Sequence, residues 1–266
     1  MHSLETGTLV EELAGEAGLG EAAIVVLPLD PGSQLFAGGV ARRSERAIYP
    51  ASTIKVPIAA VLAAFWESGR LERRDPVVVS PANVTANDCE SPLLAGYQTS
   101  LEELGRLMLT RSDNVATNVL IDVLGRDVIS RMSQSWGLRA TAVRRKLSGG
   151  DPLIDDSEAD GRNAHSAADS ARLYAMIGYG VHWAEPWLIE TLLDQQWNEK
   201  LSRGLRAGDR FAHKTGDTSE VSHDGGIVFT PQGTRFVVVV HTELPSSPEN
   251  DERFGAFMSS LRPLLD

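Results

Sequence analysis

Residues 49–66 read YPASTIKVPIAAVLAAFW. After the turn at Pro50, the run of residues 53–66 is apolar on every side except at Lys55. A helix that is apolar all round is covered by protein on every side, so this stretch predicts a helix inside a core. Ser52 falls at the N-terminal end of that helix and Lys55 in its first turn. The stretch therefore predicts a buried helix that begins with two chemically active side chains.

Strand patterns lie at both ends of the chain, outside this helix. Near the N-terminus we expect a short helix over residues 8–15, then a β-hairpin of strands 22–29 and 34–38 around Pro31-Gly32. Near the C-terminus we expect strands at 210–214, 221–229 and 235–242, and a closing helix over residues 251–265. Strands from both ends of the chain must therefore meet in one sheet.

The stretch between these strands has helix signals. Capping boxes are expected at two places, where Ser100 precedes Glu103 and where Ser166 precedes Asp169. Other helices are expected over 115–124, which stops at Gly125, and over 185–196. We predict an α/β (α+β) fold of one domain, residues 1–266. An antiparallel sheet with flanking terminal helices (about 1–50 and 205–266) carries an inserted all-helical subdomain (about 51–204).

Charge and composition exclude several classes of protein. The 266 residues include 25 Lys and Arg against 36 Asp and Glu, a net charge of −11. Such an acidic chain repels phosphate, so nucleic acid and anionic membranes are not expected partners. The single cysteine, Cys89, permits neither an intrachain disulfide nor a cysteine zinc site. The partner we expect is a small-molecule substrate, and the chain is expected to be a monomer.

Residues 1–20 lack the basic and apolar regions of a signal peptide. The longest apolar run, residues 56–66, is too short to span a bilayer. As written, the chain is expected to be cytoplasmic; removal of a leader would make it an exported protein.

Ser52 and Lys55 have the spacing S-x-x-K, which places both side chains on one face of a helix. A serine hydroxyl becomes an effective nucleophile when an adjacent base takes its proton. Lysine serves as that base when burial and positive neighbours lower its pKa. This spacing also arises by chance about once in a chain of this length, so it needs support from other motifs.

Two further motifs supply that support. Ser112-Asp113-Asn114 lies between two expected helices, and Lys214-Thr215-Gly216 ends an expected strand. Taken singly, the first is an ordinary helix cap and the second an ordinary strand end. The three motifs follow one another at intervals of 60 and 102 residues. S-x-x-K, S-D-N and K-T-G in this order form the signature of class A β-lactamases and penicillin-binding proteins.

The chain resembles the class A β-lactamase family, within the wider group of penicilloyl-serine transferases, over essentially its whole length. The resemblance implies that Ser52 is acylated and that Lys55 accepts its proton, directly or through water. Ser112 would relay a proton to the leaving nitrogen, and Asn114 would bond Lys55 and the amide of the substrate's side chain. Lys214 would keep the site positive. No metal and no cofactor are implied.

The resemblance also implies contacts with substrate after the K-T-G motif. Thr215 and Gly216 would help bind the substrate carboxylate, and the backbone N–H groups of Ser52 and Asp217 would form an oxyanion hole. His223, which precedes Asp224 on the next expected strand, is a further candidate for a substrate contact.

One departure from the family bears on activity. Class A enzymes carry an E-x-x-L-N glutamate that activates the deacylating water, and residues 146–163 (KLSGGDPLIDDSEADGRN) lack that motif. The acidic residues in this segment are Asp151, Asp155, Asp156, Glu158 and Asp160. The sequence does not choose among them, and a solvated acidic loop is the simpler interpretation.

The expected function is therefore that of a serine hydrolase acting on β-lactams through an acyl-serine, with slow deacylation. Three alternatives stay open: an esterase or amidase for another small acyl compound, a D-Ala-D-Ala peptidase, and a binder that is acylated once.

Overall fold

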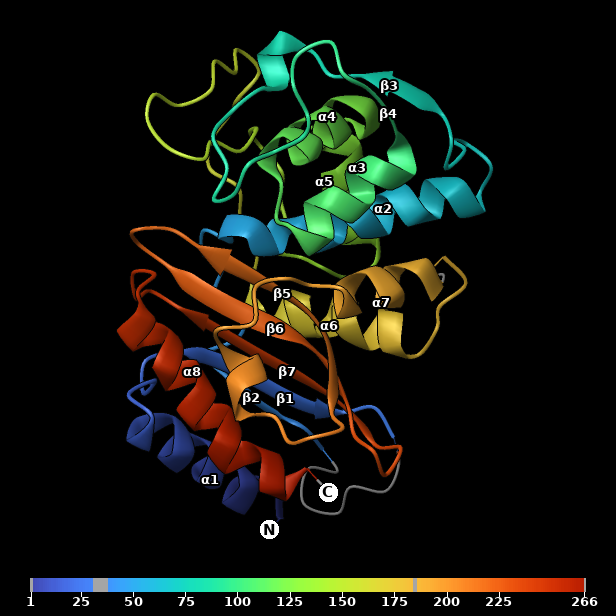
Figure 1. The fold of residues 1–266 in the computed structure, drawn as a ribbon. Coiled ribbons are helices and arrows are strands. Elements are labelled where there is room, and N and C mark those ends of the chain that lie inside the picture. The colour runs from blue at the N-terminus through green and yellow to red at the C-terminus, as the bar shows by residue number, and fades with distance from the viewer. Residues whose placement is uncertain (1, 31–37, 184–185, 266) are drawn as a thin grey trace.

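A central antiparallel sheet organises the protein. The computed structural model describes residues 2–30, 38–183 and 186–265. The sheet has the order β2-β1-β7-β6-β5, so strands from both ends of the chain lie side by side (Figure 1). Its strands are β1 (Ala23–Pro28), β2 (Val40–Arg42), β5 (Arg210–Asp217), β6 (Ser222–Phe229) and β7 (Arg235–Thr242). A separate pair consists of β3 (Pro76–Val78) and β4 (Gln98–Ser100).

Helices cover both faces of the sheet. α1 and α8 lie on one face, α6 lies on the other, and α2–α5 form a block beyond the edge strand β5 (Figure 1). The helices are α1 (His2–Glu16), α2 (Lys55–Glu67), α3 (Leu101–Thr110), α4 (Asn114–Leu124), α5 (Arg126–Ser135), α6 (Ala167–Gly178), α7 (Pro186–Leu193) and α8 (Pro248–Leu261). Short 3-10 turns are η1 (Ala51–Ile54), η2 (Pro81–Asn83), η3 (Leu201–Gly204) and η4 (Arg262–Leu264). None of the helices in the described ranges is long and apolar enough to cross a bilayer.

Strand β7 shows why the sheet is covered on both sides. Its sequence RFVVVVHT has no polar alternation over Val237–Val240, as expected for a central strand that is buried on both faces. Val237 and Val239 pack into the core shared with α2 and α6. Val238 and Val240 pack into the second core, with Phe254 and Phe257 of α8. The two cores together fix the sheet between the helical layers.

Most of the expected elements are present. The fold class is confirmed, and α2 is buried on every side along its length from Lys55 to Ala64. The expected strand over 34–38 falls outside the described residues except for Gly38, which lies in a turn. The strand that pairs with β1 is β2, with Val25 opposite Ala41.

The two expected capping boxes form only in part. Ser100 Oγ accepts from the N–H of Glu103, and Ser166 Oγ accepts from the N–H of Asp169. The carboxylates do not return the bond, because Glu103 accepts from Thr99 Oγ1 and Asp169 accepts from the Thr141 hydroxyl and a backbone N–H.

Candidate active site

The turn that carries Ser52 is strained and tightly bonded. The carbonyl of Pro50 accepts hydrogen bonds from the backbone N–H of Thr53 (3.1 Å) and from its hydroxyl (2.7 Å). Ala51 has a φ of +46°, which is uncommon for a residue with a side chain. Strain of this kind persists where the surrounding structure holds it, and it is frequent at functional sites. Here it presents Ser52 at the start of η1, directly before α2.

Lys55 joins this turn to the S-D-N motif. Its Nζ donates to the Ser112 carbonyl at 2.6 Å and to Asn114 Oδ1 at 2.8 Å, and lies 3.1 Å from Ser112 Oγ. The side chain is fully buried. All three contacts therefore hold one lysine nitrogen at a fixed point between α2 and the start of α4.

The S-D-N residues have different structural tasks. Ser112 has a φ of +59°, a second strained position at the site. Asp113 is the cap of α4, where its side chain accepts from the N–H of Ala116. Asn114 Oδ1 faces Lys55, while its amide nitrogen donates to the Ala86 carbonyl at 3.1 Å. The cap thus fixes the orientation of the two residues that contact Lys55.

The K-T-G motif ends strand β5 beside the Ser52 turn. Lys214 is fully buried, and its Nζ donates to the Thr215 carbonyl at 3.0 Å. A Cβ at Gly216 would lie 2.9 Å from the Pro50 carbonyl oxygen and 3.1 Å from the backbone nitrogen of Ser52. Only glycine therefore lets the strand approach the turn so closely. The three motifs, far apart in the sequence, meet at one place.

Burial changes the acidity of both site lysines. Desolvation lowers the pKa of Lys55 well below its ordinary value of 10.5, and the positive charge of Lys214 lowers it further. Desolvation also lowers the pKa of Lys214, to about 7. Two ammonium groups in one buried site disfavour each other, so a neutral amine becomes available near neutral pH.

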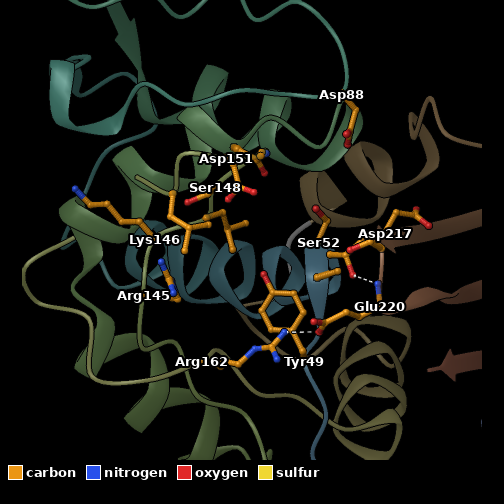
Figure 2. Close-up of a pocket in the computed structure, with 18 residues that line it drawn as sticks. Tyr49, Ser52, Asp88, Arg145, Lys146, Ser148, Asp151, Arg162, Asp217 and Glu220 are labelled. Carbon is orange, nitrogen blue, oxygen red and sulfur yellow. Dashed lines mark hydrogen bonds and ion pairs between the residues drawn. The ribbon is translucent and has the colours of Figure 1, made fainter. Parts of the chain in front are cut away.

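A cavity of about 560 Å³ opens beside Ser52 (Figure 2). Of the predicted site residues, Ser52, Asn114 and Asp217 line it. Lys55, Ser112, Lys214, Thr215 and Gly216 are buried next to these residues. Tyr49 and the segment 145–151 supply further walls. Eight of the nine predicted site residues therefore either line the cavity or lie buried next to the residues that line it.

One acidic residue of the segment 146–163 reaches the cavity. Asp151 lines it, on the side opposite Ser52 and Asp217 (Figure 2). Asp156 does not, because its carboxylate accepts from the N–H of Lys146 and pairs with Arg126 at 2.5 Å. The other three acids of this loop, Asp155, Glu158 and Asp160, are exposed and do not line this cavity. The structure thus separates five carboxylates that the sequence leaves equivalent.

The prediction for His223 needs correction. Its ring is fully buried and does not line the cavity. Nδ1 accepts from the N–H of Thr242 at 3.1 Å, so the proton lies on Nε2, which donates to the Tyr49 carbonyl at 3.0 Å. Both ring nitrogens therefore bind backbone, and burial lowers the pKa of His223 to about 4. His223 is a neutral structural residue that supports the Ser52 turn.

Sequence reasoning missed Lys200. Its Nζ donates to both carboxylate oxygens of Asp217, at 2.6 and 2.7 Å. A signal was present, because the chain has four lysines and two of them lie in the motifs. All four, Lys55, Lys146, Lys200 and Lys214, are at most 8 % exposed. Buried lysines are rare in proteins, so the positions of the buried lysines in this chain indicate where the site lies.

Tyr49, Arg162 and Glu220 form another part of the cavity wall that no motif indicates. The Arg162 guanidinium lies 4.6 Å from the centre of the Tyr49 ring and pairs with Glu220 at 2.8 Å. Among the residues that the structure describes, no cluster of three His, Cys, Asp or Glu side chains is suited to a metal ion.

Known proteins are similar to this chain in sequence and in fold. The sequence model of a family described as the beta-lactamase enzyme family matches residues 8–261. A β-lactamase of Rhodobacter capsulatus is 31 % identical over 129 residues, so the chain aligns with 43 % of that relative and with 47 % of its own length.

Solved structures are similar over nearly the full chain. PBP-A is 26 % identical, with a TM-score of 0.81 over 96 % of this chain and 95 % of that one. A single-site mutant of PBP-A, solved as an acyl-enzyme complex with penicillin G, is 25 % identical with a TM-score of 0.82 over the same shares. A β-lactamase from Sphaerobacter thermophilus DSM 20745 shares the fold, with 24 % identity and a TM-score of 0.79 over 97 % and 96 %.

Proposed function

The chain belongs to the beta-lactamase enzyme family, and from this we propose that it is a serine hydrolase that opens β-lactams through an acyl-serine intermediate. The observation that carries the proposal is the position of Lys55. Its buried Nζ lies within hydrogen-bond distance of Ser112 and Asn114, one helical turn after Ser52. Lys55 follows Ser52 by three residues, so its amine is on the same face of the helical turn, where a buried amine can activate the Ser52 hydroxyl as a nucleophile.

Acylation begins with attack of Ser52 Oγ on the carbonyl carbon of the lactam. The hydroxyl proton passes to the neutral Nζ of Lys55, directly or through water. The tetrahedral oxyanion accepts from the backbone N–H groups of Ser52 and Asp217. When the C–N bond breaks, the leaving nitrogen takes a proton that returns from Lys55 through the Ser112 hydroxyl. The 3.1 Å between Lys55 Nζ and Ser112 Oγ suits this relay.

The remaining motif residues hold the substrate. The Lys214 ammonium, when protonated, attracts an anionic group, and Thr215 and Gly216 border the same part of the site. Asn114 presents its amide beside Lys55 and lines the cavity, where it contacts the acyl side chain of the substrate. These contacts supply orientation, which converts a bimolecular attack into an effectively unimolecular one.

Asp151 is the proposed base for deacylation. It is the acid of the loop 146–163 that lines the cavity. Its carboxylate would take a proton from water as the water oxygen attacks the ester carbonyl. The acyl C–O bond to Ser52 then breaks, and the Ser52 oxygen takes up the proton that Asp151 accepted, which restores the hydroxyl and the carboxylate. An aspartate carboxylate reaches one methylene less far than that of the E-x-x-L-N glutamate of class A enzymes. We therefore propose that deacylation limits turnover.

Intact-protein mass spectrometry tests this function. After mixing with benzylpenicillin, the chain is expected to gain the mass of one penicillin on Ser52, with slow hydrolysis followed by absorbance. Ser52→Ala is expected to gain no mass. A wild-type chain with neither adduct nor turnover would overturn the proposal, as would an adduct that survives in Ser52→Ala.

A second candidate is a peptidase for D-Ala-D-Ala peptides, because S-x-x-K, S-D-N and K-T-G are also the signature of penicillin-binding proteins. The same acyl-serine chemistry then releases D-alanine. Release of D-alanine from a D-Ala-D-Ala peptide, with a penicillin adduct that lasts for hours, would favour this reaction over β-lactam hydrolysis.

A further inference from the structure

Lys200 is a buried lysine directly before η3, outside all three motifs. Besides its two bonds to Asp217, its Nζ donates to the His223 carbonyl at 3.1 Å. It also lies 5.5 Å from the centre of the Phe254 ring on α8. One ammonium group therefore ties the ends of β5 and β6 to the segment before η3 and to α8.

Asp217 is the residue through which Lys200 reaches the site. It follows Gly216 at the end of β5, pairs with Ser222 in the ladder, and accepts from the Ser222 hydroxyl at 3.1 Å. Its side chain is 33 % exposed and lines the cavity, while the side chain of Lys200 is 3 % exposed. Asp217 thus faces the cavity on one side, and a buried cation holds it on the other.

The pair also acts on Lys214. The Asp217 carboxylate raises the pKa of Lys214 against the larger, lowering effect of burial, and the Lys200 ammonium lowers it in the same direction as burial. Asp224 and Asp88 add smaller effects that raise it, and Lys55 is the other cation near Lys214. The effects of Lys200 and Asp217 on the pKa of Lys214 oppose each other, so burial remains the main influence on that pKa.

We propose that Lys200 is a positioning residue for the acylation reaction: it fixes the Asp217 end of β5 against the Ser52 turn and neutralises the Asp217 carboxylate beside Lys214. This inference rests on the proposed function, because it gives Lys200 a part in that reaction. Lys200 touches no reacting atom; it acts through Asp217, whose backbone N–H is the proposed oxyanion donor.

Removing the Lys200 charge and removing the Asp217 charge should shift the pKa of Lys214 in opposite directions. Without Lys200, the Asp217 carboxylate is uncompensated, so the pKa of Lys214 rises. Without the Asp217 charge, Lys200 alone remains and the pKa of Lys214 falls. A unit charge at short range in a protein moves a neighbouring pKa by about one pH unit.

The experiment titrates Lys214 directly in the full chain. Labelling with [ε-¹³C]lysine gives four signals, because the chain has four lysines. Lys214→Met and Lys200→Met identify two of them. The Lys214 signal is then followed from pH 5 to pH 11 in wild type, Lys200→Met, Lys200→Arg, Asp217→Asn and the double variant. Acylation by benzylpenicillin is measured over the same pH range.

We expect the midpoint of Lys214 to rise by about one pH unit in Lys200→Met and to fall in Asp217→Asn. The double variant should lie between the two single variants. Acylation should slow at least tenfold in Lys200→Met, from the loss of the strand anchor, and Lys200→Arg should restore most of it. An unchanged Lys214 midpoint in both single variants overturns the proposal, as does wild-type acylation in Lys200→Met.

Two results keep this inference separate from the proposed function and from folding. Failure of the wild type to form an adduct overturns the proposed function. The lysine titration still measures how Lys200 and Asp217 affect the pKa of Lys214 in that case. If Lys200→Met does not fold, Asp217→Asn, which is nearly isosteric, decides by itself: an unchanged Lys214 midpoint there is sufficient to reject the proposal.

Discussion

Lys55 Nζ lies 3.1 Å from the hydroxyl oxygen of Ser112, although 57 positions separate the two residues in the chain. The contact joins the first turn of α2 to the strained residue before α4. Because Lys55 is fully buried, these polar atoms have little competition from water. The relationship makes Lys55 the centre of the proposed proton relay.

Replacing Lys55 with methionine removes the base and keeps much of the side-chain volume. We expect acylation of Ser52 by benzylpenicillin to slow by about 10²–10⁴-fold, the usual contribution of a general base. Stopped-flow absorbance measures the rate, and thermal unfolding checks the fold. Wild-type acylation in this variant would show that Lys55 is not the base.

Asp151→Asn is expected to trap the acyl-enzyme, because an amide does not accept a proton from water. Deacylation should slow by about 10²-fold or more while acylation is nearly unchanged. Asp151→Glu should speed deacylation, since its carboxylate extends further into the cavity. The matched control is Asp155→Asn, an exposed acid of the same loop that does not line the cavity. Equal adduct lifetimes in the Asp151 and Asp155 variants would contradict the assignment.

Lys214→Met should stabilise the folded protein and slow its acylation. The folded-state pKa of Lys214, about 7, lies below its ordinary value of 10.5. The unfolded chain therefore binds this proton more tightly, and the cost to stability is complete below pH 7 and disappears as the pH rises towards 10.5. We expect a gain in the free energy of unfolding of about 1–4 kcal/mol at pH 6.

Urea unfolding of wild type and Lys214→Met at pH 6 and pH 10 measures this gain. It should be large at pH 6 and small at pH 10. Acylation by benzylpenicillin should fall by at least about 10²-fold, the usual cost of losing a preorganised charge at the site. A variant that is less stable than wild type at pH 6 would show that the buried Lys214 is well solvated or paired.

Gly216→Ala tests the close approach of β5 to the Ser52 turn. The new Cβ would meet the Pro50 carbonyl oxygen at 2.9 Å and Ser52 nitrogen at 3.1 Å. The strand and the turn must separate, so we expect a loss of about 1–3 kcal/mol in stability and slower acylation. Gly7→Ala, where a Cβ has nothing within 4 Å, is the control for the substitution itself. Normal acylation in Gly216→Ala would mean that this packing is not needed.

Three buried histidines predict sensitivity to acid. The rings of His223 and His241 lie 4.5 Å apart, and those of His165 and His241 6.2 Å apart. Burial lowers the pKa of His165 to about 3 and that of His223 to about 4, and it lowers that of His241 as well. The unfolded chain therefore binds more protons below pH 6.5, so stability falls as the pH drops from 6.5 towards 4.

Each histidine contributes a slope of about 1.4 kcal/mol per pH unit within that window. Urea unfolding at pH 7, 6 and 5 measures the slope. His165→Gln should reduce it, whereas His182→Gln, which lies outside the cluster, is the control. A free energy of unfolding that is flat between pH 7 and pH 5 would show that the histidines are protonated in the folded protein.

The sequence by itself determined the fold class and predicted the residues of the candidate site. The buried helix, the strands of both ends and the three motifs are local patterns, because burial periodicity and capping depend on near neighbours in the chain. The apolar run of β7 and the cap at Ser166 are examples of such patterns. Ser52, Lys55 and Lys214 are predicted as site residues in this way, since their motifs specify residue type and spacing.

Only the tertiary structure decided which neighbours these groups have. Asp151 differs from Asp156 because the carboxylate of Asp156 is bound by Arg126 and by the N–H of Lys146. His223 turned out to be structural because Thr242 and Tyr49 occupy both ring nitrogens. Contacts across long separations and the desolvation that sets pKa values depend on packing, and packing is not written in any single stretch of the sequence.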